Sequence, residues 1–435
     1  MKKVLIITYY WPPSGGAGVQ RMLKFVKYFS QFEIEPIVIT VDDKKASYQL
    51  KDETLLIDIP ANLRIIKTNT FEPFEIYKVL VNKKEIPHSG FANEPNPGLM
   101  QKIMRFIRGN LFIPDARIGW NRYAYKAALQ IIKSEKIDAI ITSSPPHSTQ
   151  IVGLKLKKKF NIPWIADLRD PWTDIYFYNK LFHTSLAKKI DSNYEKKVLE
   201  NADSIVVVSQ DIKRIFTTKS NIINEDKIIV LPNGFDEDDF SENVNINPNE
   251  FSITYTGTFA DIYKIDGFLA AYKKLIETNK DTTIKLKFIG MISESLPKKI
   301  KKLNLQDHVS FENYVPHKES IKFLQKSSIL LLVIPKMDKN EGILTGKLFE
   351  YLGSGKPILC VGPPKGDAAA IINECNAGNV FDYNDENNMI NFLEKNLKYW
   401  KENRTDKITN IIIDKYSRKN LTKELSNIIN KFTLK

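Results

Sequence analysis

Short runs of β-branched and other apolar residues alternate along the chain with segments whose apolar positions recur every three or four residues. Buried parallel strands produce the first pattern and amphipathic helices the second, so the alternation predicts parallel α/β sheets. In the first half, strands are expected at 4–8, 36–40, 139–142, 164–166 and 204–208, with helices at 19–29, 124–133, 149–159 and 192–200. In the second half, strands are expected at 252–255, 285–289, 329–334 and 357–361.

The two series of strands predict two doubly wound, Rossmann-like domains. Their boundary is expected at the Pro232-Asn233-Gly234 turn and the polar stretch after it, where no periodicity is seen. We assign 1–237 to the first domain, 238–250 to a linker and 251–385 to the second domain; 386–435 is expected to form helices that pack back over the domains. Because open α/β sheets bind ligands beyond the carboxyl ends of their strands, function is expected in a cleft where the domains face each other.

Composition and charge narrow the class of protein. Apolar residues make up 43% and charged residues 26% of the 435, as in globular chains and unlike disordered ones. The formal net charge of +13 suits nucleic acid, anionic lipid or phosphorylated small molecules, and does not choose among them. The only cysteines, Cys360 and Cys375, form neither a disulfide framework nor a zinc-binding pattern.

The N-terminal segment imitates a signal peptide without completing one. Lys2 and Lys3 precede an apolar run, but Trp11-Pro12-Pro13 ends that run and no convincing cleavage site follows. We expect a first strand here instead. No window approaches the roughly 18 apolar residues that span a bilayer, so a cytoplasmic protein is expected.

A glycine-containing loop joins the first expected strand to the first expected helix. Gly15 and Gly16 allow backbone N–H groups to approach an anion at the positive end of that helix. The loop is neither a Walker A motif nor a G-x-G-x-x-G fingerprint, which disfavours an NTPase or a dehydrogenase. The alternative is a tight turn without a ligand.

Two further segments can bind phosphate in the second domain. Gly257-Thr258 follows its first strand, and Lys264 is close enough to reach a diphosphate, although a solvated surface lysine is the alternative. Farther along, Gly342 and Gly346 flank the start of a helix that carries Lys347 and Glu350 on nearly the same face. A lysine for phosphate and a carboxylate for ribose hydroxyls would together bind a nucleoside diphosphate.

Several motifs, in this order, resemble those of the GT-B glycosyltransferases of the retaining family 4, especially bacterial surface-polysaccharide enzymes. They are Tyr9-Tyr10-Trp11-Pro12-Pro13 with Gly15-Gly16, Ser143-Ser144-Pro145-Pro146, Ala166-Asp167-Leu168-Arg169-Asp170-Pro171-Trp172, Pro232-Asn233-Gly234-Phe235-Asp236, Tyr255-Thr256-Gly257-Thr258 and the stretch 347–357. The resemblance runs from residue 1 to about 385. It implies a nucleotide-sugar donor held mainly by the second domain, an acceptor on the first, and no cofactor or obligatory metal.

The resemblance also implies roles for donor-binding residues. Gly15 and Gly16 should face the diphosphate and the reacting sugar, and Lys264 matches the family's phosphate lysine. Thr258 replaces the family's arginine, a loss for which Lys347 can compensate. Glu350 matches the glutamate expected on ribose. The family's other glutamate falls at Gly342, with Glu341 one place away, so either Glu341 or backbone amides take its place. Base and sugar selectivity is expected around Val315 and from Gly342 to Thr345.

Three residues at strand ends of the first domain are candidates for catalysis. His147 can hydrogen-bond substrate or shuttle a proton, and a loop histidine without function is the alternative. Asp170 can act as a base toward the acceptor hydroxyl, with Arg169 as its ion-pair partner or a phosphate ligand; the alternative is an ion pair that caps the next helix. The other histidines, among them His317, have no evident partners and receive no role.

A basic amphipathic helix is predicted from Leu99 to Phe112. Leu99, Ile103 and Phe106 share one side, whereas Lys102, Arg105 and Arg108 share another. Such a helix can lie on an anionic membrane, which would place the protein at the inner face of the membrane. The alternative is a helix packed in the core with a solvated basic edge.

The favoured function is therefore a glycosyltransferase that acts on a glycan or lipid-linked acceptor of surface polysaccharide or cell-envelope biosynthesis. A nucleotide-sugar 2-epimerase is one alternative, although it would need more acid/base groups than the few histidines suggest. A second is a non-catalytic scaffold that has kept the fold. Nucleic acid is not expected as a partner, because no recognisable module interleaves basic and aromatic residues.

Overall fold

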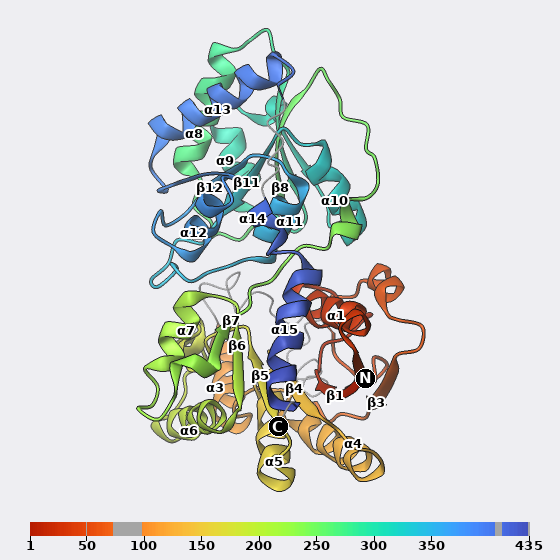
Figure 1. Cartoon of the computed structure of the whole chain (residues 1–435). Helices are drawn as coiled ribbons and strands as arrows, with labels where there is room; N and C mark the ends of the chain where they lie inside the picture. Colours follow the sequence, from red (N-terminus) through yellow and green to blue (C-terminus); the bar gives the residue numbers. More distant parts are fainter. Residues whose placement is uncertain (49, 73–97, 405–410, 434–435) are drawn as a thin grey trace. The chain divides into compact units, whose positions relative to one another are not determined.

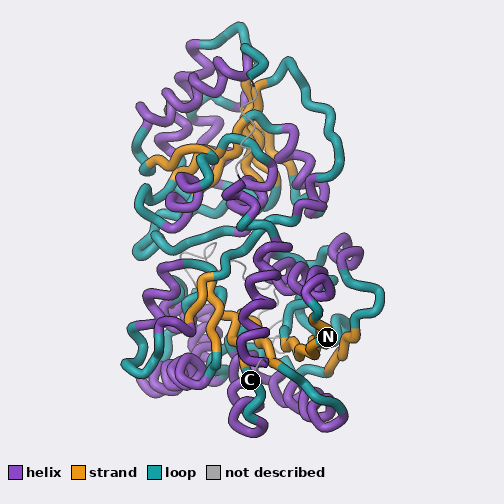
Figure 2. Tube along the Cα trace, viewed as in Figure 1, coloured by secondary structure: helices purple, strands orange, loops and turns teal. Residues whose placement is uncertain are grey.

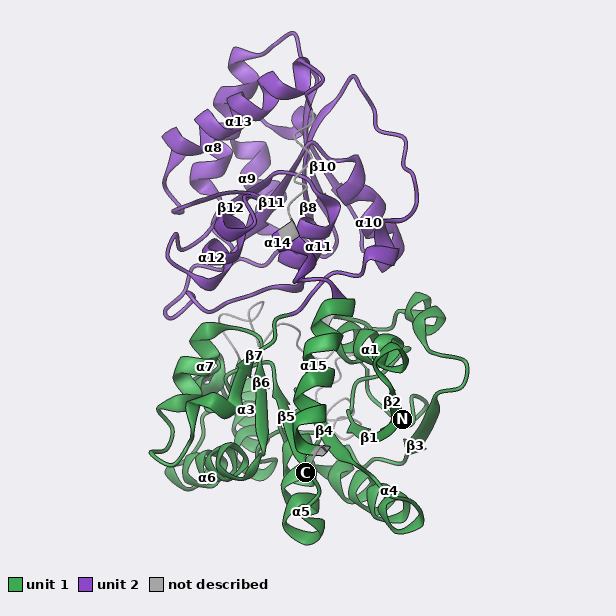
Figure 3. Ribbon diagram, viewed as in Figure 1, with its two compact units in different colours: residues 1–232, 419–435 green, residues 233–418 purple. Residues whose placement is uncertain are grey.

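The computed structural model describes residues 1–48, 50–72, 98–404 and 411–433, which form two compact units (Figure 1). Unit 1 consists of Met1–Pro232 and Lys419–Lys435, and unit 2 of Asn233–Arg418 (Figure 3). Each unit is a parallel sheet enclosed by helices (Figure 2). The predicted architecture of two Rossmann-like α/β domains is confirmed.

The described part of unit 1 contains a sheet of seven parallel strands in the order β3-β2-β1-β4-β5-β6-β7. The strands are β1 (Lys2–Ile7), β2 (Ile34–Val41), β3 (Arg64–Thr68), β4 (Ala139–Ser144), β5 (Trp164–Leu168), β6 (Ser204–Val207) and β7 (Ile228–Val230). The order reverses at β1, where β2 and β4 are its two neighbours. In doubly wound folds this reversal opens a crevice at the carboxyl ends of the strands.

Helices cover both faces of this sheet. They are α1 (Ala17–Phe29), α3 (Leu99–Leu111), α4 (Asn121–Ser134), α5 (Ser148–Phe160), α6 (Ser185–Asn201), α7 (Gln210–Thr217) and α15 (Arg418–Thr433). Alternate residues of β1 explain why both faces need cover, since Leu5 and Ile7 enter one core while Val4 and Ile6 enter the other. Residues of α4 and α5 contribute to the first core, and residues of α1 contribute to the second.

The last helix, α15, completes the core of unit 1 together with α1 (Figure 1). Leu421, Leu425, Ile428 and Ile429 are all buried there, at exposed fractions of 5% or less. The Nζ atom of Lys2 also donates a hydrogen bond to Asn430, at 2.7 Å. Of the segment predicted to pack back, 386–435, α15 therefore packs against the first sheet, whereas residues 386–401 belong to the core of unit 2.

The described part of unit 2 contains six parallel strands in the order β10-β9-β8-β11-β12-β13. The strands are β8 (Phe251–Thr256), β9 (Ile284–Ile289), β10 (Val309–Glu312), β11 (Ile329–Val333), β12 (Ile358–Val361) and β13 (Gly378–Phe381). The helices are α8 (Asp266–Thr278), α9 (Ser295–Lys302), α10 (His317–Lys326), α11 (Gly346–Ser354), α12 (Asp367–Glu374), α13 (Glu386–Lys401) and α14 (Ile411–Asp414). The order reverses at β8, so β8 and β11 flank the crevice expected in this unit.

Two cores hold unit 2 together, one on each face of its sheet. The first packs α8, α9 and α13 against the strands, whereas the second packs α10, α11 and α12. Residues 238–250, predicted as a linker, begin with a short helix, Glu237–Phe240, capped by the buried Asp236. Gln325 of α10 donates hydrogen bonds to the carbonyls of Phe240 and Glu242, so the start of this stretch is fastened to unit 2.

Candidate functional site

In unit 2, the predicted donor-binding residues lie in the segments that follow β8, β10 and β11. The chain passes through Gly257 after β8, through Val315 after β10 and through Gly342 and Thr345 after β11. In a parallel sheet these carboxyl ends all lie along one edge, the edge at which α/β proteins bind their ligands. The structure therefore gathers these sequence-distant positions along one side of unit 2.

Lys347 extends from the first turn of α11 across the end of β8. A Cβ atom at Gly257 would approach the Lys347 Cε atom to 2.6 Å, and Gly257 has a φ of +92°, so only glycine suits this position. The Lys347 Nζ atom donates to the hydroxyl of Tyr255 at 2.7 Å and to the carbonyl of Thr258 at 3.5 Å. The ammonium group thus lies beside the residue that replaces the family's arginine.

The surroundings of the Lys347 ammonium disfavour its charge. Burial lowers its pKa from 10.5 to about 8, against the opposing effect of Glu350. The faces of Tyr255 and Tyr263 lie 4.4 and 5.8 Å from Nζ and offer only partial compensation. A bound anion would supply the missing negative charge and keep the lysine protonated.

The N-terminus of α11 provides a second group suited to an anion. Its first N–H groups have no acceptor within the helix, as at the start of every α-helix. Thr345 precedes the helix, and its hydroxyl is buried without a hydrogen-bond partner among the described residues. Gly346, the first residue of the helix, leaves the backbone there open to approach.

The carboxylate of Glu350 contacts a histidine to which the sequence assigned no role. The Nε2 atom of His317, the first residue of α10, lies 3.2 Å from the Glu350 Oε1 atom. The two side chains are 13% and 19% exposed. The structure therefore gives His317 a partner that the sequence did not indicate. The contact joins residues 33 positions apart, and only the packing of α10 on α11 reveals it.

Two further predicted donor ligands, Lys264 and Glu341, differ in their contacts. The Nζ atom of Lys264 donates to the carbonyl of Asp261 in its own turn, at 2.9 Å. Glu341 is exposed, its carbonyl accepts the N–H of Asp367 at 2.8 Å, and its side chain has no hydrogen bond or ion pair within the described ranges. The structure thus ties the Glu341 backbone to the start of α12 and leaves its carboxylate unattached.

In unit 1, the glycine loop after β1 is fixed by its backbone. The N–H of Gly15 donates to the carbonyl of Leu50 at 3.0 Å, and Gly16, with a φ of +105°, precedes α1. A Cβ atom on Gly18 would collide with the guanidinium of Arg169, at 2.0 Å from Nη1. The absence of a side chain at Gly18 therefore lets Arg169 lie against the first turn of α1.

The segment after β5 carries Arg169 and Asp170, and both are partly buried. The Nε atom of Arg169 donates to the carbonyl of Ser144 at 2.9 Å. Burial raises the pKa of the Asp170 carboxyl, and Arg169 opposes that rise. Neither a hydrogen bond to this carboxylate nor an ion pair with Arg169 is found among the described residues. Its raised pKa suits Asp170 to accept a proton.

A buried ion pair between Arg21 and Asp167 lies at the end of β5, next to this segment. Asp167 of β5 accepts hydrogen bonds from Arg21 at 2.9 and 3.1 Å, and from Ser143 at 2.7 Å. Arg21 is fully buried and also donates to the carbonyl of Pro232. Sequence reasoning missed Arg21, although its position one turn after the glycine loop was a usable signal.

His147 precedes α5 and packs face to face on Trp172, with 4.8 Å between ring centroids. Burial, with a smaller contribution from Arg169, lowers its pKa from 6.5 to about 3. Its Nδ1 atom is buried and has no hydrogen-bond partner in the described part of the chain. At neutral pH the ring is therefore uncharged, and it can accept a proton only from a strong acid.

The helix predicted at Leu99–Phe112 is α3, and its exposed side is apolar. Leu99, Met100, Ile103 and Phe106 are 77%, 54%, 45% and 47% exposed. Arg105, predicted on the basic edge, is instead 5% exposed. The alternative of a helix whose apolar side is buried in the core is therefore wrong. No helix in the described ranges is both long and apolar enough to cross a membrane.

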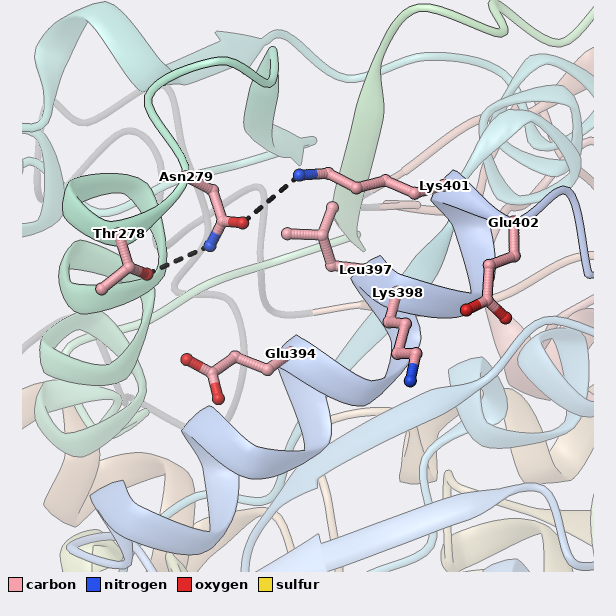
Figure 4. Close-up of a pocket in the computed structure, with 7 residues that line it drawn as sticks. All are labelled: Thr278, Asn279, Glu394, Leu397, Lys398, Lys401 and Glu402. Carbon is pink, nitrogen blue, oxygen red and sulfur yellow. Dashed lines mark hydrogen bonds between the residues drawn. The ribbon is translucent and has the colours of Figure 1, made fainter.

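A surface pocket of about 560 Å³ lies between the C-terminal ends of α8 and α13 (Figure 4). Its lining includes Thr278, Asn279 and Lys401, and Lys401 points toward Asn279. Helix C-termini lie at the amino ends of the strands, so this pocket is at the opposite edge of the sheet from Gly257 and Lys347. None of the predicted site residues lines it.

No metal site emerges from the described side chains. No group of three or more histidine, cysteine, aspartate or glutamate residues in the described ranges could hold a metal ion. In unit 2, an anion joined to a polyol would suit the groups at the strand ends instead. These groups are Lys347, the start of α11 and Glu350.

Two family models of known proteins match this chain. The family model described as Glycosyltransferase Family 4 matches 86–239, and the model described as Glycosyl transferases group 1 matches 236–428. A search of curated proteins gave no significant match.

Solved structures share the fold over nearly the whole chain. Sucrose-phosphate synthase from Thermosynechococcus elongatus is 12% identical, with a TM-score of 0.64 and complete coverage of both chains. Anabaena HepE in complex with UDP is 13% identical, with a TM-score of 0.63 and coverage of 99% of this chain and 100% of that one. A glycosyltransferase from Rickettsia africae is 16% identical, with a TM-score of 0.60 and coverage of 99% of both chains. The family matches and the shared fold show that this chain is a GT-B glycosyltransferase, similar to those of family 4.

Proposed function

We propose that this enzyme transfers a hexosyl group from a nucleoside-diphosphate sugar to a hydroxyl of a glycan or lipid-linked acceptor. The observation that carries the proposal is the arrangement at the carboxyl edge of the unit 2 sheet. There Lys347 crosses Gly257, and the same helix that begins beside it carries Glu350 one turn later. The solved structures of HepE in complex with UDP and with UDP-glucose support a donor of this class.

Each donor group has a partner in this arrangement. The diphosphate lies against the Lys347 ammonium and the first N–H groups of α11, and the ribose hydroxyls donate to Glu350. Negative charge grows on the diphosphate as the glycosidic bond breaks, so groups fixed in advance at that position lower the barrier. Lys347 thereby replaces the arginine absent at Thr258. No obligatory metal is required, since the leaving charge is met by the protein's own groups.

Unit 1 supplies the acceptor side of the reaction. Asp170, whose raised pKa favours proton uptake, accepts the proton of the attacking hydroxyl. Arg169 holds that segment through Ser144. Transfer with retention of the anomeric configuration, which the family resemblance implies, is checked by the anomeric proton signal of the product.

An anionic membrane surface is the proposed location of the acceptor. The exposed apolar side chains of α3 insert at the boundary of headgroups and acyl chains, and the exposed Lys102 faces anionic headgroups. Asn110 ties the end of α3 to the start of α6, where Phe182 and Leu186 are also exposed. The enzyme then works at the inner face of the membrane, on intermediates of surface-polysaccharide assembly.

The test is a thermal-shift screen with nucleoside diphosphates and their sugars, followed by transfer assays with the stabilising donor and a panel of glycan and lipid-linked acceptors. A true donor stabilises the folded state by mass action. Conversion of the donor without any acceptor would instead indicate an epimerase. Binding without conversion or transfer would indicate a scaffold, and no response to any nucleotide would overturn the donor proposal. Removal of metal ions with EDTA should leave the rate of transfer unchanged.

A further inference from the structure

The contact between His317 and Glu350 has a defined chemical direction. A carboxylate only accepts hydrogen bonds, so the Nε2 atom of a neutral His317 must carry the proton. The Oε1 atom of Glu350 is 3.2 Å away and receives it. With Oε1 oriented by the histidine, Oε2 of the same carboxylate is the oxygen available to a ligand.

His317 is also well placed to connect two parts of the donor site. It is the first residue of α10 and follows Val315 by two positions, in the segment between β10 and α10. Glu350 lies on α11, in the same helix as Lys347. The hydrogen bond thus joins the segment predicted to contact the base to the helix predicted to contact ribose and phosphate.

We propose that His317 is a positioning residue for the donor: it fixes the Glu350 carboxylate in the orientation that receives the ribose hydroxyls. Without this bond, the flexible glutamate side chain would have to be ordered by the nucleotide itself, and the affinity for the nucleotide would fall. The inference rests on the proposed function, because it assumes that Glu350 binds ribose.

The experiment compares wild type with His317→Leu and His317→Gln. Leucine removes the hydrogen-bond donor of the side chain, whereas the amide of glutamine can still donate a hydrogen bond to a carboxylate at a similar distance. Isothermal titration with the diphosphates of uridine, guanosine, cytidine and adenosine first identifies the nucleotide that wild type binds. That nucleotide and its 2′,3′-dideoxy analogue are then titrated into each variant, with the melting temperature recorded to confirm folding.

The expected result is a loss of about tenfold in affinity for the ribonucleotide in His317→Leu, which corresponds to one hydrogen bond to a charged group. His317→Gln should recover most of that loss. The dideoxy analogue should bind wild type and His317→Leu equally, since it offers no ribose hydroxyls to Glu350. In turnover, His317→Leu should raise the donor KM much more than it changes kcat.

Any of three outcomes would overturn the inference. Equal weakening of both nucleotides in His317→Leu would mean that the residue only maintains the local fold, and no weakening would mean that it has no effect on Glu350. Failure of wild type to bind any nucleotide would overturn the proposed function and this inference with it. Binding by wild type without the ribose-dependent difference would overturn the inference alone.

Discussion

At the scale of single residues, the buried ammonium group of Lys347 carries a cost in stability. Its pKa of about 8 lies below the usual value because burial disfavours the ammonium form. The folded protein therefore holds this proton less tightly than the unfolded chain does, so the penalty is fully present below pH 8 and fades as the pH rises toward 10.5. In the proposed donor site, the same positive charge would attract the diphosphate.

Lys347→Met should separate the two effects. At pH 7 we expect the variant to unfold with a free energy higher by on the order of 2 kcal/mol, while it loses most of its affinity for nucleoside diphosphate. In wild type, donor affinity should fall as the pH rises through about 8, and the variant should show no such fall. Denaturant titration and nucleotide titration from pH 6.5 to 9.5 provide the measurements.

Lys398→Met is the matched control, because Lys398 is exposed and lines the pocket at the opposite edge of the sheet. It should alter neither the nucleotide affinity nor its pH dependence. Full donor affinity in Lys347→Met would remove Lys347 from the proposed donor site.

His147 gives a second prediction at this scale. Its folded-state pKa of about 3 lies below the unfolded value of 6.5, so its neutral form stabilises the fold above pH 6.5 and this contribution is lost as the pH falls. His147→Phe keeps a ring to pack on Trp172 but cannot be protonated. Between pH 7 and pH 5, wild type should lose ~2 kcal/mol more unfolding free energy than the variant, measured by urea titration. Parallel losses would show that His147 does not carry the acid sensitivity.

At the scale of elements, the sequence revealed the inner strands of both sheets and missed the outer ones. The strands not predicted were β3, β7, β10 and β13, which are the edges of the two sheets. Inner strands are buried on both faces and read as continuous apolar runs, whereas an edge strand such as β3 carries the exposed Arg64 and Lys67.

The same reasoning explains which parts of the candidate site were predictable. Gly257 and Lys347 could be placed because each belongs to a local pattern, a strand end or a helix start. The His317–Glu350 contact and the Arg21–Asp167 ion pair could not, since each depends on tertiary packing between segments far apart in the sequence. The exposure of individual side chains could not be predicted from the sequence either, as the buried Arg105 of α3 shows.

The helix α3 carries the prediction at this scale. The triple variant Leu99→Ser, Ile103→Ser and Phe106→Ser loses exposed apolar side chains that would insert in the membrane interface. In co-sedimentation with vesicles that contain about 30% phosphatidylserine or phosphatidylglycerol, it should bind at least tenfold more weakly than wild type. Lys102→Ser should weaken binding to anionic vesicles by a smaller factor, and only at low salt.

Ile57→Ser is the control, because Ile57 is 89% exposed in the same unit but lies outside α3. It should bind vesicles as wild type does. Equal vesicle binding by the triple variant and wild type would show that α3 does not contact the membrane. Activity on a short water-soluble acceptor should remain unchanged in all three variants.

At the scale of the whole molecule, α15 determines whether unit 1 is complete. Deletion of 419–435 removes four buried apolar side chains from its core, each worth roughly 1.5–3 kcal/mol. We expect the truncated protein to lose the cooperative melting transition of unit 1 while unit 2 keeps its own. Differential scanning calorimetry with and without the bound nucleoside diphosphate distinguishes the two, because the nucleotide should raise only the unit 2 transition. An unchanged unit 1 transition would contradict the packing of α15.

Because both ends of the chain build unit 1, the whole of unit 2 is an insertion between them. A protease that nicks the chain once, within 241–250, would yield two fragments, yet the second fragment would still hold the first through α15. Separation by proteolysis would take another cut, after Arg418. Coexpressed fragments split at 241–250 should therefore copurify, because α15 of the second fragment packs in the core of the first. The polypeptide 233–418 is the segment that can be expressed alone with both hydrophobic cores of unit 2 and none of the core of unit 1.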